Sequence, residues 1–567
     1  MILNIDQLSL SEAALKAPST TIHPLLTPPL DDGFAVTDML ATPIETAGVS
    51  LQANFPIKVT ALPNKGRSYV ATRMIQPQEL VFVAEAFGTA MCDPWLDCGV
   101  CHYCWMTIQD RKGQVRLPRS EIDGQGKKKK LETVMVFCDE TCVQLYGAET
   151  ANMICRVEHK IRRTWNENGA SCWEPRLSAS TGQSTPTISV SSGDAAAVAA
   201  AAAAAAVVPA LVSVTTHYSI LIQQALSMAD TPEAVLELND QDQSCFLNNV
   251  WNALDGLIDE QESFLLDRST ESPDQKYTQK HFEAFYPTLA TYLLEGNNNA
   301  SIATRISDDD FETARLISEV LYRRQLDMQD KGLPSSQVSE VTKSTVQGER
   351  ATFADYCAMQ SNELALLRQQ LILDISEREH DKDDIQDLDL DQEIGQEQDP
   401  DLRSHDHPIK QWRRLLSTLP AHLLGCFYIY LRLRDAYLLL SQEEKTTSAT
   451  TLSIDNILFR TILYAEVANS FGIRDASDEL LGFAVFPRAC FFNHSCRPNI
   501  EKKRRCGDKA RQMEYWSTRV IEQGEECCIS YGDISKGRAE RQSRLEDMYF
   551  FKCSCVRCIE EEEEMAN

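Results

Sequence analysis

The chain has 567 residues, of which 43% are hydrophobic, so it can form a large packed core and roughly two to four domains. Its 55 basic and 83 acidic residues give a net charge of −28, which disfavours direct nucleic-acid binding and favours a basic protein substrate. Nineteen cysteines and an N-terminus without a basic signal-peptide region indicate a reducing compartment. We therefore expect a monomer in the nucleus, the cytoplasm or both.

The first informative segment is Lys65-Gly66-Arg67, which lies between two stretches that predict short strands. A glycine-centred turn between strands explains this segment equally well, so it carries little weight alone.

A cysteine-rich region follows. Cys101-x-x-Cys104 and Cys138-x-x-x-Cys142 predict one four-thiolate zinc site across a loop of 33 residues. Cys98 could replace Cys101, and an unmetallated loop is the alternative.

Residues from about 160 to 450 predict a helical layer that packs against the strands. Segments with apolar residues three and four positions apart lie near 213–229, 243–267, 273–294, 308–328, 355–376 and 409–441. The apolar run 195–212 is mostly alanine, so we expect a linker or helix and no membrane span. Flexible segments are expected at 178–206, 329–350 and the acidic run 374–401.

Three unusual motifs close the chain: Asn493-His494-Ser495-Cys496-Arg497-Pro498-Asn499, Ile529-Ser530-Tyr531-Gly532-Asp533 and Cys553-Ser-Cys555-Val-Arg-Cys558. The last supplies three thiolates, and a structural zinc needs four ligands, so Cys496 is the natural fourth. A shared zinc would place Phe550 and Phe551 beside Tyr531. Free surface thiols are the alternative. The glutamates at 560–564 predict a solvated tail.

Together these motifs resemble the SET-domain methyltransferases, and in particular the SMYD-type branch, whose SET domain is split by a MYND zinc module and a longer insert. The likeness covers roughly residues 55–160 and 455–560. The full MYND pattern needs further cysteines that are absent between Cys104 and Cys138, so we expect a degenerate module with one zinc at most. The chain stops shortly after Cys558, so the C-terminal helical-repeat domain of longer family members is not expected.

The resemblance implies an α+β fold: a SET-domain β fold with short strands and a threaded C-terminal segment, split by a zinc module and a large, mostly helical insert. The expected parts are the N-terminal SET portion 55–91, the MYND-like module 92–160, the insert 161–450, the C-terminal SET portion 451–535 and the post-SET zinc motif 545–560.

The resemblance also implies the roles of single residues. S-adenosylmethionine would be bound by Lys65, Arg67, Asn469, Asn493, His494 and Tyr531. Tyr531 would be the catalytic tyrosine, with Tyr549 and Phe551 lining a channel for the substrate lysine, although these two could be ordinary core aromatics. Two structural zinc sites would use Cys101, Cys104, Cys138 and Cys142, and Cys496, Cys553, Cys555 and Cys558.

The sequence thus predicts an S-adenosylmethionine-dependent protein-lysine N-methyltransferase that acts on a basic protein, with histone tails as candidates. The alternative is a catalytically weak or inactive SET-fold scaffold or transcriptional co-regulator. Retention of Asn493, His494 and Tyr531 favours the enzyme, whereas the incomplete MYND module favours the scaffold.

Overall fold

The structure is a computed structural model that describes part of the chain. The described residues are 55–63, 65–96, 99–108, 114–117, 135–168, 217–270, 286, 289–290, 293–294, 308–330, 351–384, 408–443, 454–475, 477–505 and 507–566. They fall into two compact units, here called the helical unit (155–314 and 362–460) and the sheet unit (2–154, 315–361 and 461–567).

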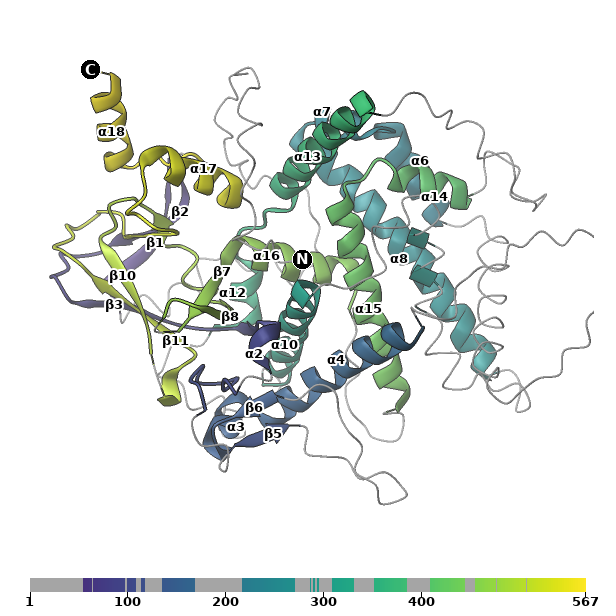
Figure 1. The fold of residues 1–567 in the computed structure, drawn as a ribbon, viewed down its shortest axis with the longest axis horizontal. Coiled ribbons are helices and arrows are strands. Elements are labelled where there is room, and N and C mark those ends of the chain that lie inside the picture. Colours follow the sequence, from purple (N-terminus) through teal and green to yellow (C-terminus); the bar gives the residue numbers. More distant parts are fainter. Residues whose placement is uncertain are drawn as a thin grey trace, which may run out of the picture. The chain divides into compact units, whose positions relative to one another are not determined.

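The helical unit consists of helices (Figure 1). These helices enclose buried aromatic residues. Its helices are α6 (His217–Met228), α7 (Pro232–Glu237), α8 (Asp240–Thr270), α13 (Glu363–Asp384), α14 (Pro408–Leu416) and α15 (Ala421–Glu443). Three further helices have residues in both units: α4 (Ala148–Asn168), α10 (Asp308–Asp330) and α16 (Asn456–Asn469). Trp251 is fully buried, with its ring centroid 4.5 Å from Phe427 and 5.7 Å from Phe459.

The sheet unit contains all the described strands, which are short. They are β1 (Ile57–Leu62), β2 (Gly66–Ala71), β3 (Leu80–Glu85), β4 (Gly88–Met91), β5 (Val115–Leu117), β6 (Met135–Phe137), β7 (Ser470–Arg474), β8 (Leu480–Val485), β9 (Asn493–His494), β10 (Ile500–Arg504), β11 (Gln512–Ser517) and β12 (Cys528–Ile529). Its other elements are α2 (Asp93–Leu96), α3 (Glu140–Tyr146), α12 (Phe353–Cys357), η4 (Gly507–Lys509), α17 (Arg538–Tyr549) and α18 (Val556–Ala566).

Strands from the two ends of the chain pair directly with each other. The sheets have the orders β1-β2, β10-β11-β3, β4-β8-β7, β5-β6 and the parallel pair β12-β9. In the β4-β8 pair Ala90 faces Phe483, and in the β3-β11 pair Phe82 faces Tyr515. The expected α+β class is therefore confirmed, and two segments about 400 residues apart build one β core.

The core of the sheet unit is aromatic. Phe492 lies stacked on Tyr515 with ring centroids 4.5 Å apart, and it lies 4.7 Å from Tyr69. Because Phe492 directly precedes β9, this packing fixes the start of the Asn493-His494 segment.

Helix α10 approaches the sheet unit's strands at Gly88. A Cβ atom there would lie 2.6 Å from Val320 Cγ2 and 3.0 Å from Leu316 Cδ1, so only glycine permits this contact. For this one helix, the contact agrees with the expectation that the insert packs on the strands.

A buried ion-pair network reinforces the same contact. Glu319 of α10 accepts hydrogen bonds from Thr89 (N, 3.0 Å; Oγ1, 2.8 Å), Arg511 (2.7 Å), Arg323 (2.8 Å) and Tyr146 (3.2 Å). Burial raises the pKa of Glu319, but Arg511 and Arg323 more than offset this and lower it to about 2. The carboxylate therefore stays charged and joins α10, β4, α3 and the loop before β11.

Two of the predicted helices are broken. The segment 409–441 forms α14 and α15, which are separated at Pro420 because proline lacks a backbone N–H and disfavours helical geometry in the residue before it. The segment 355–376 forms α12 and α13. Thr352 and Asp355 cap α12 reciprocally, so this helix starts earlier than expected.

Both acidic runs are helical where the structure describes them, while Glu560, Glu562, Glu563 and Glu564 are exposed, as expected of a solvated tail. Helix α13 continues to Asp384, into the run 374–401, and residues 560–564 lie within helix α18. In α18 Glu560 pairs with Arg497, Glu561 with Arg541, and Glu562 with Arg538. These tertiary partners order a segment whose local charge density favours disorder.

Some expectations fall outside the described residues. These are the runs 178–206 and 195–212, nearly all of 329–350 and most of 273–294, although Tyr286, Leu289 and Leu293 are buried. No helix in the described part of the chain combines the length and apolar composition needed to cross a lipid bilayer.

Candidate functional site

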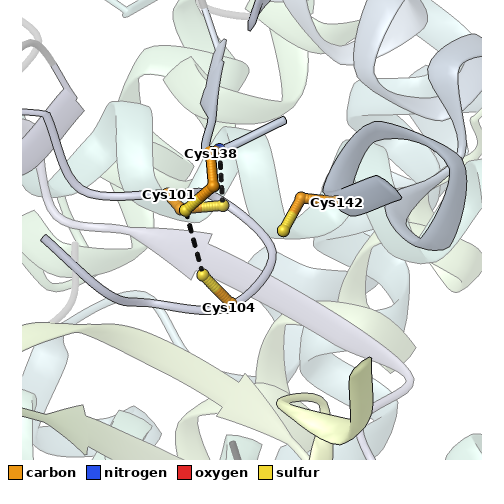
Figure 2. Close-up of side chains that lie close together, drawn as sticks. All are labelled: Cys101, Cys104, Cys138 and Cys142. Carbon is orange, nitrogen blue, oxygen red and sulfur yellow. Dashed lines mark hydrogen bonds between the residues drawn. The ribbon is translucent and has the colours of Figure 1, made fainter. Parts of the chain in front are cut away.

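The first cysteine cluster forms where a turn, a strand end and a helix meet. Cys101 and Cys104 lie in one turn, Cys138 follows β6, and Cys142 lies in α3 (Figure 2). The Sγ atoms of Cys104 and Cys138 are 3.5 Å apart, and the Cys138 amide donates to Cys101 Sγ at 3.4 Å. Asp139 caps α3 by accepting from the Cys142 amide at 2.9 Å, which orients the fourth sulfur.

The second cluster joins three parts of the C-terminal region. Cys496 follows β9, Cys553 and Cys555 precede α18, and Cys558 lies in its first turn. The Sγ atoms of Cys496 and Cys558 are 3.6 Å apart. The assignment of Cys496 as the partner of the three late cysteines is therefore confirmed spatially.

Both clusters fit a tetrahedral metal. The four sulfurs of each cluster lie within 4.8 Å of one another, and zinc with Zn–S bonds of about 2.3 Å would separate them by about 3.8 Å. A hydrogen bond from Cys104 lowers the pKa of Cys101 to about 5, and one from Cys553 lowers that of Cys555 to about 3. Each cluster thus holds a thiolate near neutral pH, the form that binds metal. Cys101 completes the first cluster among the described residues, whereas Cys98, its possible replacement, lies outside them.

Tyr531 lies in an aromatic group beside the second cluster. Its ring centroid is 4.9 Å from Tyr549, 6.4 Å from Phe551 and 5.4 Å from His494. Phe550 adopts a left-handed conformation (φ 59°) that ends α17 and separates Tyr549 from Phe551 along the backbone. The structure therefore brings together the tyrosine and the two residues predicted to line its channel.

Hydrogen bonds fix Tyr531 further. Its hydroxyl donates to the Phe492 carbonyl at 3.0 Å, and burial raises the pKa of Tyr531 well above its usual value. The hydroxyl thus stays protonated at neutral pH.

His494 links Tyr531 to the second cluster. Its Nδ1 accepts from the Tyr531 amide at 3.0 Å, and its Nε2 lies 3.3 Å from Cys496 Sγ. Because Nδ1 is an acceptor, the ring proton of neutral His494 is on Nε2 and points to the sulfur. Burial lowers the pKa of His494 to about 4, so the ring is neutral at pH 7.

Lys65 and Asn493 converge on a residue that the sequence analysis missed. Glu526 accepts hydrogen bonds from Lys65 Nζ (2.6 Å), Ser68 (2.8 Å) and Asn493 Nδ2 (3.0 Å). Lys65 is still 45% exposed. In the sequence, Glu526 is marked only by its place beside Glu525, shortly before β12. This pattern does not tell which glutamate of the pair binds Lys65.

Arg67 and Asn469 lie against a different segment. Arg67 donates to the Ala358 carbonyl at 2.5 Å and lies over the Phe491 ring, whereas Asn469 donates to the Gln360 carbonyl at 2.9 Å. The six predicted cofactor residues thus form three groups: Lys65 and Asn493 lie at Glu526, Arg67 and Asn469 lie against the segment after α12, and His494 and Tyr531 lie beside the second cysteine cluster.

A model of the SET domain matches residues 360–532. The chain therefore carries a SET domain, and its two four-cysteine clusters fit a SET and MYND-type arrangement, as the sequence predicted. The match begins within the segment assigned to the insert, and the expected domain boundaries remain predictions.

Similar proteins include several named lysine methyltransferases. The chain is 42% identical over 110 residues to "Potential protein lysine methyltransferase SET6" of Saccharomyces cerevisiae, which covers 18% of this chain and 28% of the relative. It is 38% identical over 104 residues to "N-lysine methyltransferase SMYD2" of Gallus gallus and 36% over 106 residues to that of Homo sapiens, covering 18% of this chain and 23% and 24% of those proteins. The chain thus matches about a quarter of the length of these relatives.

A buried carboxyl group near Asn469 makes the stability of the protein depend on pH. Glu466 of α16 is 2% exposed, and burial raises its pKa from 4.5 to about 7. The unfolded chain therefore loses this proton at lower pH than the folded protein, so stability falls as pH rises from about 4.5 to 7.

Glu466→Gln should remove this dependence, because the amide does not titrate. Between pH 5 and pH 8 the free energy of unfolding of the variant should rise by about 2 kcal/mol relative to the wild type, as measured by urea denaturation. The exposed Glu233→Gln in α7 is the control and should follow the wild type at both pH values. Parallel pH profiles for Glu466→Gln and the wild type would contradict the prediction.

Proposed function

We propose that this protein is an S-adenosylmethionine-dependent protein-lysine N-methyltransferase. The observation that carries the proposal is Tyr531, held by His494 and the Phe492 carbonyl within the aromatic group of Tyr549 and Phe551. The SET-domain match and the relatives named lysine methyltransferases support it.

The aromatic group would prepare the nucleophile. A free lysine has a pKa of about 10.4, so removing its proton at pH 7 costs about 4.6 kcal/mol. Rings that exclude water disfavour the charged ammonium and reduce this cost. The Tyr531 hydroxyl would then orient the neutral amine.

Two sets of side chains fit the cofactor. Bound S-adenosylmethionine would supply the electrophilic methyl group. Lys65 offers a partly exposed cation for a carboxylate, while Asn493 in β9 and Asn469 at the end of α16 offer side-chain amides. Glu526 holds Lys65 in place, and it would compete with any incoming carboxylate.

We propose structural roles for both metal sites. Four cysteines in each cluster would fill a tetrahedral zinc and leave no position for substrate or water. The second cluster would then fix the segments that carry His494, Tyr531 and Phe551.

A second candidate is a scaffold without activity. The observation that favours it is the Lys65–Glu526 ion pair, which satisfies the cation that the cofactor needs. Under either function we propose a basic protein partner, with histone tails as candidates, and a location in the nucleus, the cytoplasm or both.

Calorimetric titration of the purified, zinc-loaded chain with S-adenosylmethionine distinguishes the two. We expect micromolar binding that is lost in the Asn493→Ala, His494→Ala double variant. Arg474→Ala in β7, whose side chain pairs with the nearby Asp478, is the control and should bind like the wild type. A folded wild-type chain that does not bind S-adenosylmethionine would contradict the proposed methyltransferase activity and favour the scaffold.

A further inference from the structure

Arg541 is a buried arginine whose surroundings the proposed reaction does not explain. It lies in the first turns of α17, and its side chain is only 4% exposed. Its Nε donates to Cys496 Sγ at 3.3 Å, and its Nη2 lies 3.9 Å from Cys558 Sγ. A guanidinium contains only donors, so both sulfurs must accept, as thiolates do.

The same guanidinium also binds helix α18 and the turn before α17. Nη2 donates to Glu561 Oε2 at 2.5 Å, and Nη1 donates to the Lys536 carbonyl at 2.5 Å. Arg541 therefore connects two cluster sulfurs, the turn before α17 and helix α18. A lysine could not make these contacts together, because it presents one point charge rather than a planar fork.

Charge explains why an arginine is placed there. Four thiolates around Zn²⁺ leave a net charge of −2, which is costly at a site where Cys496 and Cys558 are both 1% exposed. N–H···S hydrogen bonds from a fixed cation spread this charge. A guanidinium is not deprotonated in proteins, so the cation persists.

We propose that Arg541 is a positioning residue that stabilises the metal form of the Cys496, Cys553, Cys555 and Cys558 cluster and couples α18 to it. This inference rests on the proposed zinc site. It adds a functional role for α18, because Arg541 contacts both the cluster sulfurs and Glu561 of this helix, so that metal binding would help to order α18.

The chain offers a matched control in Arg557. This residue also pairs with Glu561 (2.8 Å) and donates to the backbone carbonyls of Cys496 (3.3 Å) and Ile534 (2.8 Å). None of its hydrogen bonds among the described residues reaches a sulfur. Arg557→Gln therefore removes a charge and a Glu561 contact while sparing the thiolates.

The experiment compares zinc affinity in the full chain by competition with a chromophoric chelator. Arg541→Gln should weaken zinc binding at the Cys496, Cys553, Cys555 and Cys558 cluster about 10- to 100-fold. The Cys101, Cys104, Cys138 and Cys142 cluster of the same chain is the internal reference, and its zinc affinity should not change. Arg557→Gln should change the zinc affinity of neither site by more than about 3-fold, because its hydrogen bonds to described residues reach carbonyls and a carboxylate and no ligand sulfur. Cobalt-substituted Arg541→Gln should also show a shifted sulfur-to-metal charge-transfer band, and α18 amides should exchange faster.

Arg541→Lys provides a second variant in case Arg541→Gln does not fold, and its affinity should lie between those of the wild type and Arg541→Gln. Equal affinities and equal cobalt spectra for Arg541 and Arg557 variants would overturn the inference. A wild-type zinc content that Cys555→Ser does not lower would instead overturn the proposed zinc site at the Cys496, Cys553, Cys555 and Cys558 cluster, so the two failures are distinguishable.

Discussion

Tyr531→Phe is expected to reduce methyl transfer by about 100-fold or more while leaving S-adenosylmethionine affinity unchanged. The substitution removes only the hydroxyl that donates to the Phe492 carbonyl at 3.0 Å, and it keeps the ring that packs on Tyr549 and His494. The two quantities are measured separately, by single-turnover methylation of a core-histone mixture and by calorimetry.

Tyr549→Phe is the matched control for this prediction. Its hydroxyl donates only weakly, to the Tyr531 carbonyl at 3.4 Å, and its predicted role depends on its ring. Turnover should therefore fall much less than in Tyr531→Phe. Unchanged turnover in Tyr531→Phe would remove this residue from its catalytic role, whereas loss of cofactor binding in a folded variant would assign its hydroxyl to cofactor binding and not to the chemical step.

The cysteine clusters could be predicted because metal-ligand spacing is local. Cys101 and Cys104 share one turn, Cys138 and Cys142 flank one helix start, and both pairs are visible in a few residues of sequence. Cys496 is distant from its partners, but the unmet fourth coordination position pointed to it.

Glu526, Arg541 and Glu319 could not be predicted for the opposite reason. Each is an ordinary charged residue whose role depends on partners far away in sequence: Lys65 for Glu526, Cys496 for Arg541, and Arg511 for Glu319. Local composition describes such residues as solvated, because it contains no information on which opposite charges the fold brings near them.

The same lack of information on distant partners explains why the helix at residues 560–564 was not expected. Five consecutive glutamates predict disorder through mutual repulsion. In the structure Arg497, Arg538, Arg541 and Arg557 surround their helix and offset this repulsion. Those arginines come from the turn after β9, from α17 and from α18 itself, so only the assembled sheet unit reveals the compensation.

Glu319→Gln should cause a large loss of stability, about 3–5 kcal/mol in the free energy of unfolding. Glu319 is fully buried, and the amide would leave Arg511, itself only 5% exposed, without a compensating charge. Urea denaturation at pH 7 measures the effect. The exposed pair of Glu560 and Arg497 provides the control, because Glu560→Gln should cost less than about 1 kcal/mol.

The Glu319→Met, Arg511→Met double variant tests the cause of this loss. If the cost comes from an unpaired buried charge, removing both charges should recover much of the stability that Glu319→Gln loses. If the double variant is as unstable as the sum of both single variants, the network contributes through its separate hydrogen bonds to Thr89 and Tyr146 instead. A cost below about 1 kcal/mol for Glu319→Gln would show that apolar contacts such as Gly88 with Val320 are sufficient to hold α10 on the strands.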